Sequence, residues 1–182
     1  MADVGVRPAR RADVAAIADI QVRAWRQGYR DIVPEPVLAE MTGPAALPVW
    51  RERWTEAATA PPSGRHGVLV AVANDLVVGF AAYAPAEDAD QDPQAAAELV
   101  ALLADPVHER AGHGSRLLAA TVDLLREDGC ATLLTWVFEE HEAMRRFFGS
   151  AGWAPDGARR SLAFPSGGSA DMIRLHTDIS AP

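Results

Sequence analysis

The chain has 182 residues, of which 49% are apolar and 23% charged, a composition that predicts a single globular domain over residues 1–182. Its formal net charge is −8 and it contains no lysine, so we expect no nucleic-acid-binding face. The sequence shows no signal-peptide pattern and no apolar run of membrane-spanning length, and its single cysteine, Cys130, cannot form an intrachain disulfide. We therefore expect a cytoplasmic protein that does not associate with membranes.

The first part of the chain predicts a strand followed by helices. Residues 4–7 have strand character, and residues 11–28 carry apolar side chains at helical spacing. Asp13 falls in the first turn of this helix, where a negative charge is favourable. Residues 37–41 and 45–60 are also expected to be helical, and a run rich in proline, serine and glycine ends this region.

A hairpin is predicted next. Residues 67–73 and 76–84 are apolar and rich in β-branched side chains, and they flank Asn74 and Asp75, which favour a tight antiparallel turn. Residues 85–94 are acidic and contain proline, so we expect them to form a solvated loop.

The second half of the chain alternates strands and helices. Strands are expected at residues 98–104 and 131–137, helices at residues 112–127 and 140–151, and a final pair of strands at residues 153–163 and 170–177. This order predicts a protein of α/β (α+β) class, with a mixed sheet and helices on both of its faces.

The most specific pattern is the glycine-containing turn between the strand at residues 98–104 and the following helix. Gly112 and Gly114 have no Cβ, so their backbone amides can approach a ligand closely. A helix start presents unpaired N–H groups and a positive partial charge, which suit a pyrophosphate, and Arg110 and Arg116 can add charge-assisted hydrogen bonds. The alternative is that this Gly-His-Gly sequence is only a flexible turn before a helix.

The turn resembles the acyl-CoA loop of the GNAT superfamily of N-acetyltransferases, in which Arg/Gln-x-x-Gly-x-Gly lies between a strand ending in Asp-Pro and a Leu-Leu helix. The resemblance to bacterial members covers nearly the whole chain, with further motifs in the same order at residues 6–9, 24–29, 77–80, 135–137 and 147–153. It implies the GNAT fold, a mixed and mostly antiparallel sheet of about seven strands with helices on both faces and splayed fourth and fifth strands.

The resemblance also implies the position of acetyl-CoA, which is the co-substrate of the family, and no metal is expected. The pantetheine arm enters the gap between the splayed strands, where backbone groups of the fourth strand bind it. The implied contacts to pantetheine and thioester are Leu102, Leu103 and Ala104, and those to the pyrophosphate are Arg110, Ala111, Gly112, His113, Gly114 and Ser115. The acceptor amine then attacks the thioester directly.

Three residues depart from the family pattern. Glu109 stands where the loop usually has arginine or glutamine, and His141 replaces the usual asparagine. Phe148 occupies the position of the tyrosine that protonates the departing thiolate in many members. We expect His141 and Phe148 to contact CoA. Because a thiol has a pKa of about 8.5, the thiolate can leave near neutral pH without an acid, so we expect catalysis to be weakened but not abolished.

Several residues are candidates for the remaining roles. Glu98 is the preferred general base, directly or through water, and the alternative is an ordinary strand-end glutamate. His141 is a base, a CoA contact or a surface residue at a helix start. Tyr83 and Tyr29 are candidates for a substitute acid, although both can be half-buried structural residues. Trp25 and Tyr29 are expected to line the acceptor site, with core packing as the alternative.

The sequence therefore predicts an N-acetyltransferase that transfers acetyl from acetyl-CoA to a primary amine of a small molecule, peptide or protein. The alternative is a CoA-binding or regulatory protein of the same fold that has lost turnover, as Glu109 and Phe148 would allow. The net charge of −8 and the acidic loop favour a basic amine as acceptor. The sequence leaves open which amine is used and whether the protein is a homodimer.

Overall fold

The computed structural model describes residues 4–108, 111–165 and 167–180. Seven strands form one sheet in the order β1-β2-β3-β4-β5-β7-β6, and only the β4–β5 pair is parallel within this described part. The strands are β1 (Val4–Pro8), β2 (Gly67–Ala73), β3 (Leu76–Pro85), β4 (Ala96–Ala104), β5 (Thr132–Phe138), β6 (Ala154–Ala163) and β7 (Ser169–Asp178). The expected mixed, mostly antiparallel sheet is confirmed.

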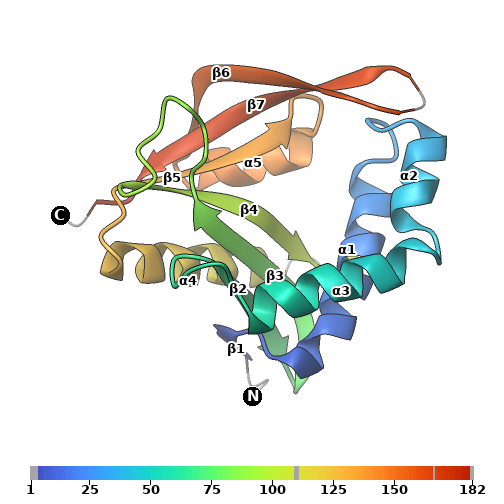
Figure 1. The fold of residues 1–182 in the computed structure, drawn as a ribbon, viewed down its shortest axis with the longest axis horizontal. Coiled ribbons are helices and arrows are strands. Elements are labelled where there is room, and N and C mark those ends of the chain that lie inside the picture. The colour runs from blue at the N-terminus through green and yellow to red at the C-terminus, as the bar shows by residue number, and fades with distance from the viewer. Residues whose placement is uncertain (1–3, 109–110, 166, 181–182) are drawn as a thin grey trace.

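Helices cover both faces of this sheet (Figure 1). They are α1 (Val14–Gly28), α2 (Glu35–Thr42), α3 (Ala46–Thr59), α4 (His113–Glu127) and α5 (Glu142–Ser150), with short 3-10 turns at Arg11–Asp13 and Pro106–His108. α1 and α3 pack over one face of β2, β3 and β4, and α4 packs over the other. The predicted elements are all present, with boundaries that differ by a few residues, as expected where helix and strand ends fray.

The turn between β2 and β3 is the tight hairpin that the sequence predicts. Asn74 and Asp75 have φ values of +49° and +64°, the left-handed conformation that a two-residue type I′ turn requires at both positions. Asparagine and aspartate tolerate this conformation better than other residues with a Cβ, so the pair fixes the register of the hairpin.

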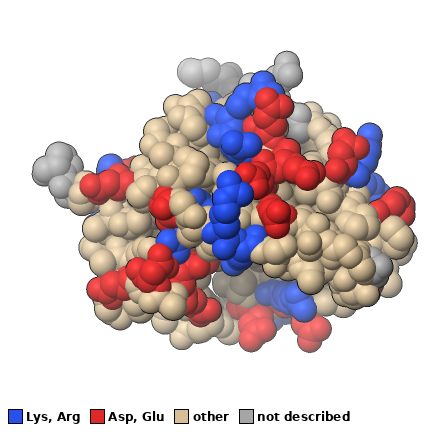
Figure 2. Space-filling view, turned by 90° about the horizontal axis from the view of Figure 1, so that it is seen from above, with Lys and Arg blue, Asp and Glu red and all other residues tan. Residues whose placement is uncertain are grey.

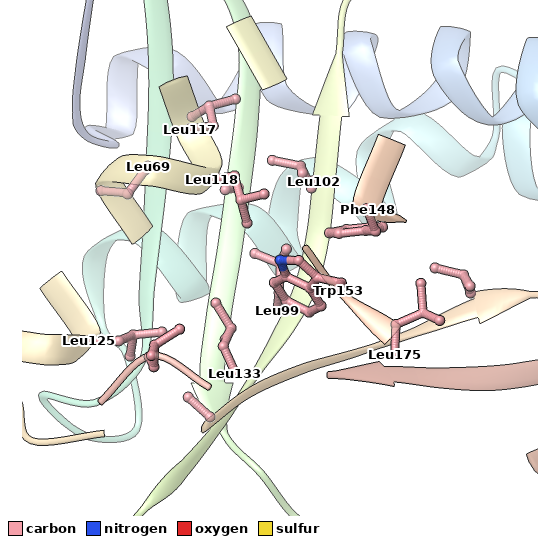
Figure 3. Packing of buried hydrophobic residues seen from close by; sticks show 14 of the residues in the cluster. Leu69, Leu99, Leu102, Leu117, Leu118, Leu125, Leu133, Phe148, Trp153 and Leu175 are labelled. Atoms are coloured by element: carbon pink, nitrogen blue, oxygen red, sulfur yellow. The ribbon is translucent and has the colours of Figure 1, made fainter. Parts of the chain in front are cut away.

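β4 carries a bulge at Val100. Ala82 of β3 lies opposite Ala101, and the next residue, Tyr83, lies opposite Leu99, so Val100 has no partner on β3. A regular strand would place Leu99 and Leu102 on opposite faces, but one extra residue brings both to the same face. Figure 3 shows these two leucines packed with Leu117 and Leu118 of α4. The bulge therefore sets which β4 side chains face each layer of helices.

β4 and β5 separate soon after they begin to pair. Their register runs only from Ala96 to Glu98 on β4, opposite Thr132 to Leu134 on β5, whereas β5 continues to pair with β7 as far as Phe138. The side-chain hydroxyl of Thr135 donates a 2.8 Å hydrogen bond to the carbonyl of Leu99, which satisfies the first β4 group past the point of separation. The expected splayed strands are confirmed, and one edge of β4 faces a gap.

Candidate active site

Two cavities meet along the free part of β4. One, the open cavity, has a volume of about 540 Å³ and is bounded by β4, by the start of α4 at Gly114 and by α5. The other, the aromatic cavity, has a volume of about 260 Å³ and lies between α1, α3, β4 and β5. The residues that line both are Leu102, Leu103, His141 and Met144. The two cavities are therefore adjacent and share part of one wall, which we call the junction.

The glycine turn supplies the wall of the open cavity at α4. Gly112 has φ +75° and precedes the first residue of α4, so the chain turns sharply into the helix. A Cβ on Gly114 would lie 3.5 Å from the ring of Phe147, which shows that α4 and α5 approach closely here. Arg116 Nη1 donates to the carbonyl of Ala111 at 2.8 Å and steadies the turn. Arg110, a predicted pyrophosphate contact, and Glu109, which departs from the family pattern, lie outside the described residues.

The neighbouring histidine adds no positive charge to this turn at neutral pH. His113 is only 5% exposed, and burial lowers its pKa below 6.5, with further lowering by Arg116 and His108. The turn therefore presents to a ligand the helix start and Arg116 rather than an imidazolium. Ser115 also lies in the first turn of α4, where it lines a separate surface depression with α5 residues.

His141 is placed at the junction by the start of α5. Its Nδ1 accepts a hydrogen bond from the backbone N–H of Met144 at 3.4 Å, so the neutral ring carries its proton on Nε2. Burial lowers the pKa of His141 below 6.5, and its ring meets that of Tyr29 edge to face at 5.8 Å. Nε2 also lies 3.0 Å from where a Cβ on Gly28 would stand. His141 thus presents a neutral Nε2–H at the junction.

Phe148 lies beneath the aromatic cavity. Its side chain is 1% exposed, its ring packs 4.8 Å from that of Trp153, and part of it lines the cavity. Figure 3 shows both rings in the core layer beside Leu99 and Leu102 of β4. The residue therefore combines a packing role with a position beside the junction.

Glu98 lies on the sheet face that carries the aromatic cavity. It pairs with Leu134 of β5, whose side chain packs with Trp136, and residues opposite one another on adjacent strands point to the same face. Burial raises the pKa of Glu98 above 4.5, Asp88 and Glu87 raise it further, and Arg160 opposes the shift. Glu98 does not line either cavity itself, so a proton would reach it through water.

Tyr83 is placed away from the junction. Its ring and hydroxyl lie too close to Gly67 of β2 for a Cβ to fit there, and Tyr83 lines neither cavity. Burial raises the pKa of Tyr83, with a contribution from Asp128, which follows the C-terminal end of α4. That end is opposite to the end at Gly112. The geometry does not support Tyr83 as the acid, whereas Trp25 and Tyr29 do line the aromatic cavity.

Sequence reasoning did not find Arg174, which fastens the acidic loop between β3 and β4. The side chain is 5% exposed and donates to Asp90 at 2.7 Å and to Asp156 at 2.6 Å, while Asp88 lies 3.6 Å away. Asp88 also accepts from the indole N–H of Trp136 at 3.4 Å. An arginine within the apolar pattern of β7 was the only signal. The loop is thus partly neutralised, and Figure 2 shows arginines flanked by acidic side chains on one face of the molecule.

The described residues hold no group of three or more histidine, cysteine or acidic side chains placed to bind a metal ion. Among those same residues, no helix is both long and apolar enough to cross a membrane.

Comparisons with known proteins converge on one family. Residues 15–153 match the model of the acetyltransferase (GNAT) family. YuaI of Bacillus subtilis, an uncharacterized N-acetyltransferase, is 28% identical over 142 residues, which cover 78% of this chain and 75% of that protein. The PaiA N-acetyltransferase of Thermoplasma acidophilum, solved with coenzyme A, superposes with TM-score 0.71 at 16% identity, covering 94% of this chain and 98% of that one. YncA of Salmonella typhimurium, a putative acetyltransferase solved with acetyl-CoA, superposes with TM-score 0.67 at 20% identity, covering 99% of this chain and 96% of that one.

Proposed function

The chain belongs to the acetyltransferase (GNAT) family, and we propose that it transfers an acetyl group from acetyl-CoA to a primary amine. The observation that carries this proposal is the separation of β4 from β5 after Glu98, which opens a gap between two cavities that share Leu102 and Leu103. Acetyl-CoA is then held on the open side and the amine on the aromatic side. A bacterial cytoplasmic enzyme is part of this proposal, supported by the Bacillus relative and by the intracellular supply of acetyl-CoA.

The residues present fit acetyl-CoA. The free edge of β4 at Leu102, Leu103 and Ala104 offers backbone groups to the pantetheine arm, as strand pairing would. The start of α4 and Arg116 suit a pyrophosphate, because the helix end and the guanidinium both favour negative charge. Gly114 leaves room in the open cavity that a side chain would fill.

For this reaction the protein needs mainly to position the two substrates and to remove a proton from the amine. Acetyl-CoA supplies an acyl carbon bonded to sulfur, so attack by the amine forms a C–N bond while sulfur leaves with the electron pair. Glu98 accepts the proton that leaves the nitrogen, through water, and its raised pKa makes it a better base near neutral pH than an exposed glutamate. His141 donates from Nε2 at the junction, where it can orient an oxygen of either substrate.

Acetyl-CoA binding is tested at Gly112. We expect Gly112→Asp to bind acetyl-CoA about thirtyfold more weakly than Gly112→Asn, because a carboxylate near the pyrophosphate costs roughly 2 kcal/mol that the isosteric amide does not. Both side chains tolerate the positive φ of this position. Gly129→Asp is the matched control, since Gly129 has φ +80° with no atom within 4 Å of an added Cβ and lies at the other end of α4. Calorimetric titration giving equal affinities for the two Gly112 variants would contradict the assignment.

A substitution at Phe148 tests whether the lack of a general acid limits the reaction. We expect Phe148→Tyr to raise kcat by about tenfold at unchanged affinity for acetyl-CoA, because a hydroxyl beside the junction can protonate the thiolate only as it departs. Phe164→Tyr is the control, since Phe164 is likewise buried but lines neither the aromatic nor the open cavity. Steady-state release of free CoA measures both. Equal kcat for wild type and Phe148→Tyr would show that acid catalysis does not limit the reaction.

The alternative function is a CoA-binding protein without turnover, which the apolar Phe148 favours. Acetyl-CoA binding with no acetyl transfer to any amine, in wild type and in Phe148→Tyr alike, would establish it.

A further inference from the structure

Aromatic rings that hold one another in place form much of the wall of the aromatic cavity. Trp25 and Trp50 meet edge to face at 5.1 Å, and Tyr29 meets Phe138 in the same way at 5.1 Å. The indole N–H of Trp50 is engaged by the carbonyl of Met41 at 2.9 Å. Rings that are held by one another and by their polar atoms are positioned before a ligand binds, and they offer flat apolar surfaces to it.

The residues known to line the aromatic cavity are uncharged, as far as the described part of the chain extends. No aspartate, glutamate or arginine is among the described residues that line it, and its polar groups are neutral side chains. Its volume of about 260 Å³ lies just below the range that is usual for drug-sized ligands. A carboxylate, a second ammonium group or a peptide backbone would be desolvated here without adequate partners. These properties favour a compact acceptor with an uncharged apolar body.

One polar group in the cavity wall is unsatisfied. Gln21 is 1% exposed, and its Oε1 accepts from the indole N–H of Trp54 at 2.6 Å. Because an indole only donates, this contact fixes the orientation of the amide and turns Nε2 away from Trp54. Nε2 is buried and has no hydrogen-bond partner among the described residues. A ligand oxygen that accepts from Nε2 would remove this deficit, with a small rotation of the side chain to expose it.

The helix sets the length of the acceptor. Gln21, Trp25 and Tyr29 succeed one another at intervals of four residues, so they follow one face of α1 toward the junction. Gly28 at the end of α1 lies against His141, and the helix rises by about 10 Å over the seven steps from Gln21 to Gly28. A substituted phenyl ring with a short alkylamine chain has about this length.

We propose that the acceptor is an arylalkylamine whose ring fills the aromatic cavity and bears a neutral oxygen that accepts a hydrogen bond from Gln21. The primary amine then reaches the junction at Leu102, Leu103 and His141. This inference rests on the proposed function and narrows its substrate to one chemical class.

The test compares acceptors that differ by one group. Tyramine, 2-phenylethylamine, spermidine, lysine and an alanine-initiated peptide are each offered with acetyl-CoA, and the acetylated products are measured by chromatography. We expect kcat/KM to be highest for tyramine, about tenfold or more above 2-phenylethylamine, because a site built to hydrogen-bond an oxygen rejects the analogue that lacks it. Spermidine, lysine and the peptide should be poorer still. Turnover of any of these three at or above the tyramine rate would overturn the proposal.

The variant Gln21→Leu tests whether the side-chain amide of Gln21 causes the preference for tyramine over 2-phenylethylamine. It should lower the ratio of kcat/KM for tyramine to kcat/KM for 2-phenylethylamine from about tenfold to about one, because only tyramine carries the oxygen. Loss of the contact to Trp54 affects both amines and leaves this ratio unaltered. An unchanged ratio would refute the hydrogen bond. Thermal melting and acetyl-CoA affinity show whether the variant is folded, and Gln21→Met repeats the test with a side chain of similar shape. If no amine is acetylated, tyramine is titrated against tryptophan fluorescence, since Trp25, Trp50, Trp54 and Trp136 line the cavity. Quenching by tyramine would support the cavity assignment while the acetyl-transfer proposal fails, and absence of quenching would refute both.

Discussion

Replacing Glu98 with glutamine should lower kcat by about a hundredfold at neutral pH, because the amide cannot accept the proton that leaves the attacking amine. The substitution keeps the shape of the side chain and its place between Ala84 and Leu134, so acetyl-CoA affinity should stay the same. Stopped assays of CoA release at saturating acetyl-CoA measure the loss, and titration calorimetry checks the affinity.

The pH profile gives an independent test of Glu98. A base must be deprotonated to act, so kcat/KM should fall as pH drops through the raised pKa of Glu98. This fall at low pH, the acid limb of the profile, should be absent in Glu98→Gln. Glu87→Gln removes a negative neighbour that raises this pKa, so the limb should move to lower pH. Arg160→Gln removes the charge that lowers it, so the limb should move to higher pH. An acid limb that persists in Glu98→Gln and is lost in His141→Asn would assign the base to the imidazole instead.

Arg174→Met should lower the free energy of unfolding by about 2–3 kcal/mol, because it leaves Asp156 and Asp88 without their buried counter-ion. This expected loss of stability is smaller than the loss from breaking a fully buried ion-pair network, because Asp90 is exposed to solvent. Urea denaturation measures it. Arg159→Met is the matched control, since Arg159 of β6 makes a similar two-bond pair with Glu139 on the surface and should have little effect. Equal stability of Arg174→Met and wild type would show that the network contributes nothing.

The same network predicts an acid-dependent stability. The hydrogen bond from Arg174 lowers the pKa of Asp90 from 3.8 to about 2. The contribution of a carboxylate with a lowered pKa is present above its unfolded-state pKa and is lost as pH falls through its folded-state pKa. Wild type should therefore lose stability between about pH 4 and pH 2, and Arg174→Met should lose less over that interval. Parallel losses in the two proteins would contradict this assignment.

Local sequence patterns were sufficient for most of the fold. The Asn-Asp turn with apolar flanks predicted the β2–β3 hairpin, and Gly112 and Gly114 between a strand and an amphipathic helix predicted the α4 turn. These features depend on residues that are close in the chain, where backbone freedom and side-chain periodicity act directly. The resemblance to one family then added the splayed strands, which local patterns do not encode.

The site itself depended on contacts between distant segments. A single bulge at Val100 decided which faces Leu99 and Leu102 occupy, and period-two reasoning alone gives the wrong face. Tyr83, a candidate acid in the sequence, lies against Gly67 because strand register and the α4 layer direct its ring there.

The sequence by itself determined the order of strands and helices and the glycine turn, because these follow from periodicity and from residues with unusual backbone freedom. Only the tertiary structure decided that Gln21 accepts from Trp54, 33 residues away in the chain, while its Nε2 has no partner among the described residues. It also decided that Arg174 meets Asp90 across 84 residues. The hydrogen-bond partners of a buried polar side chain can lie far away in the sequence, so the sequence does not reveal them. They are brought together only when the helices and the sheet pack.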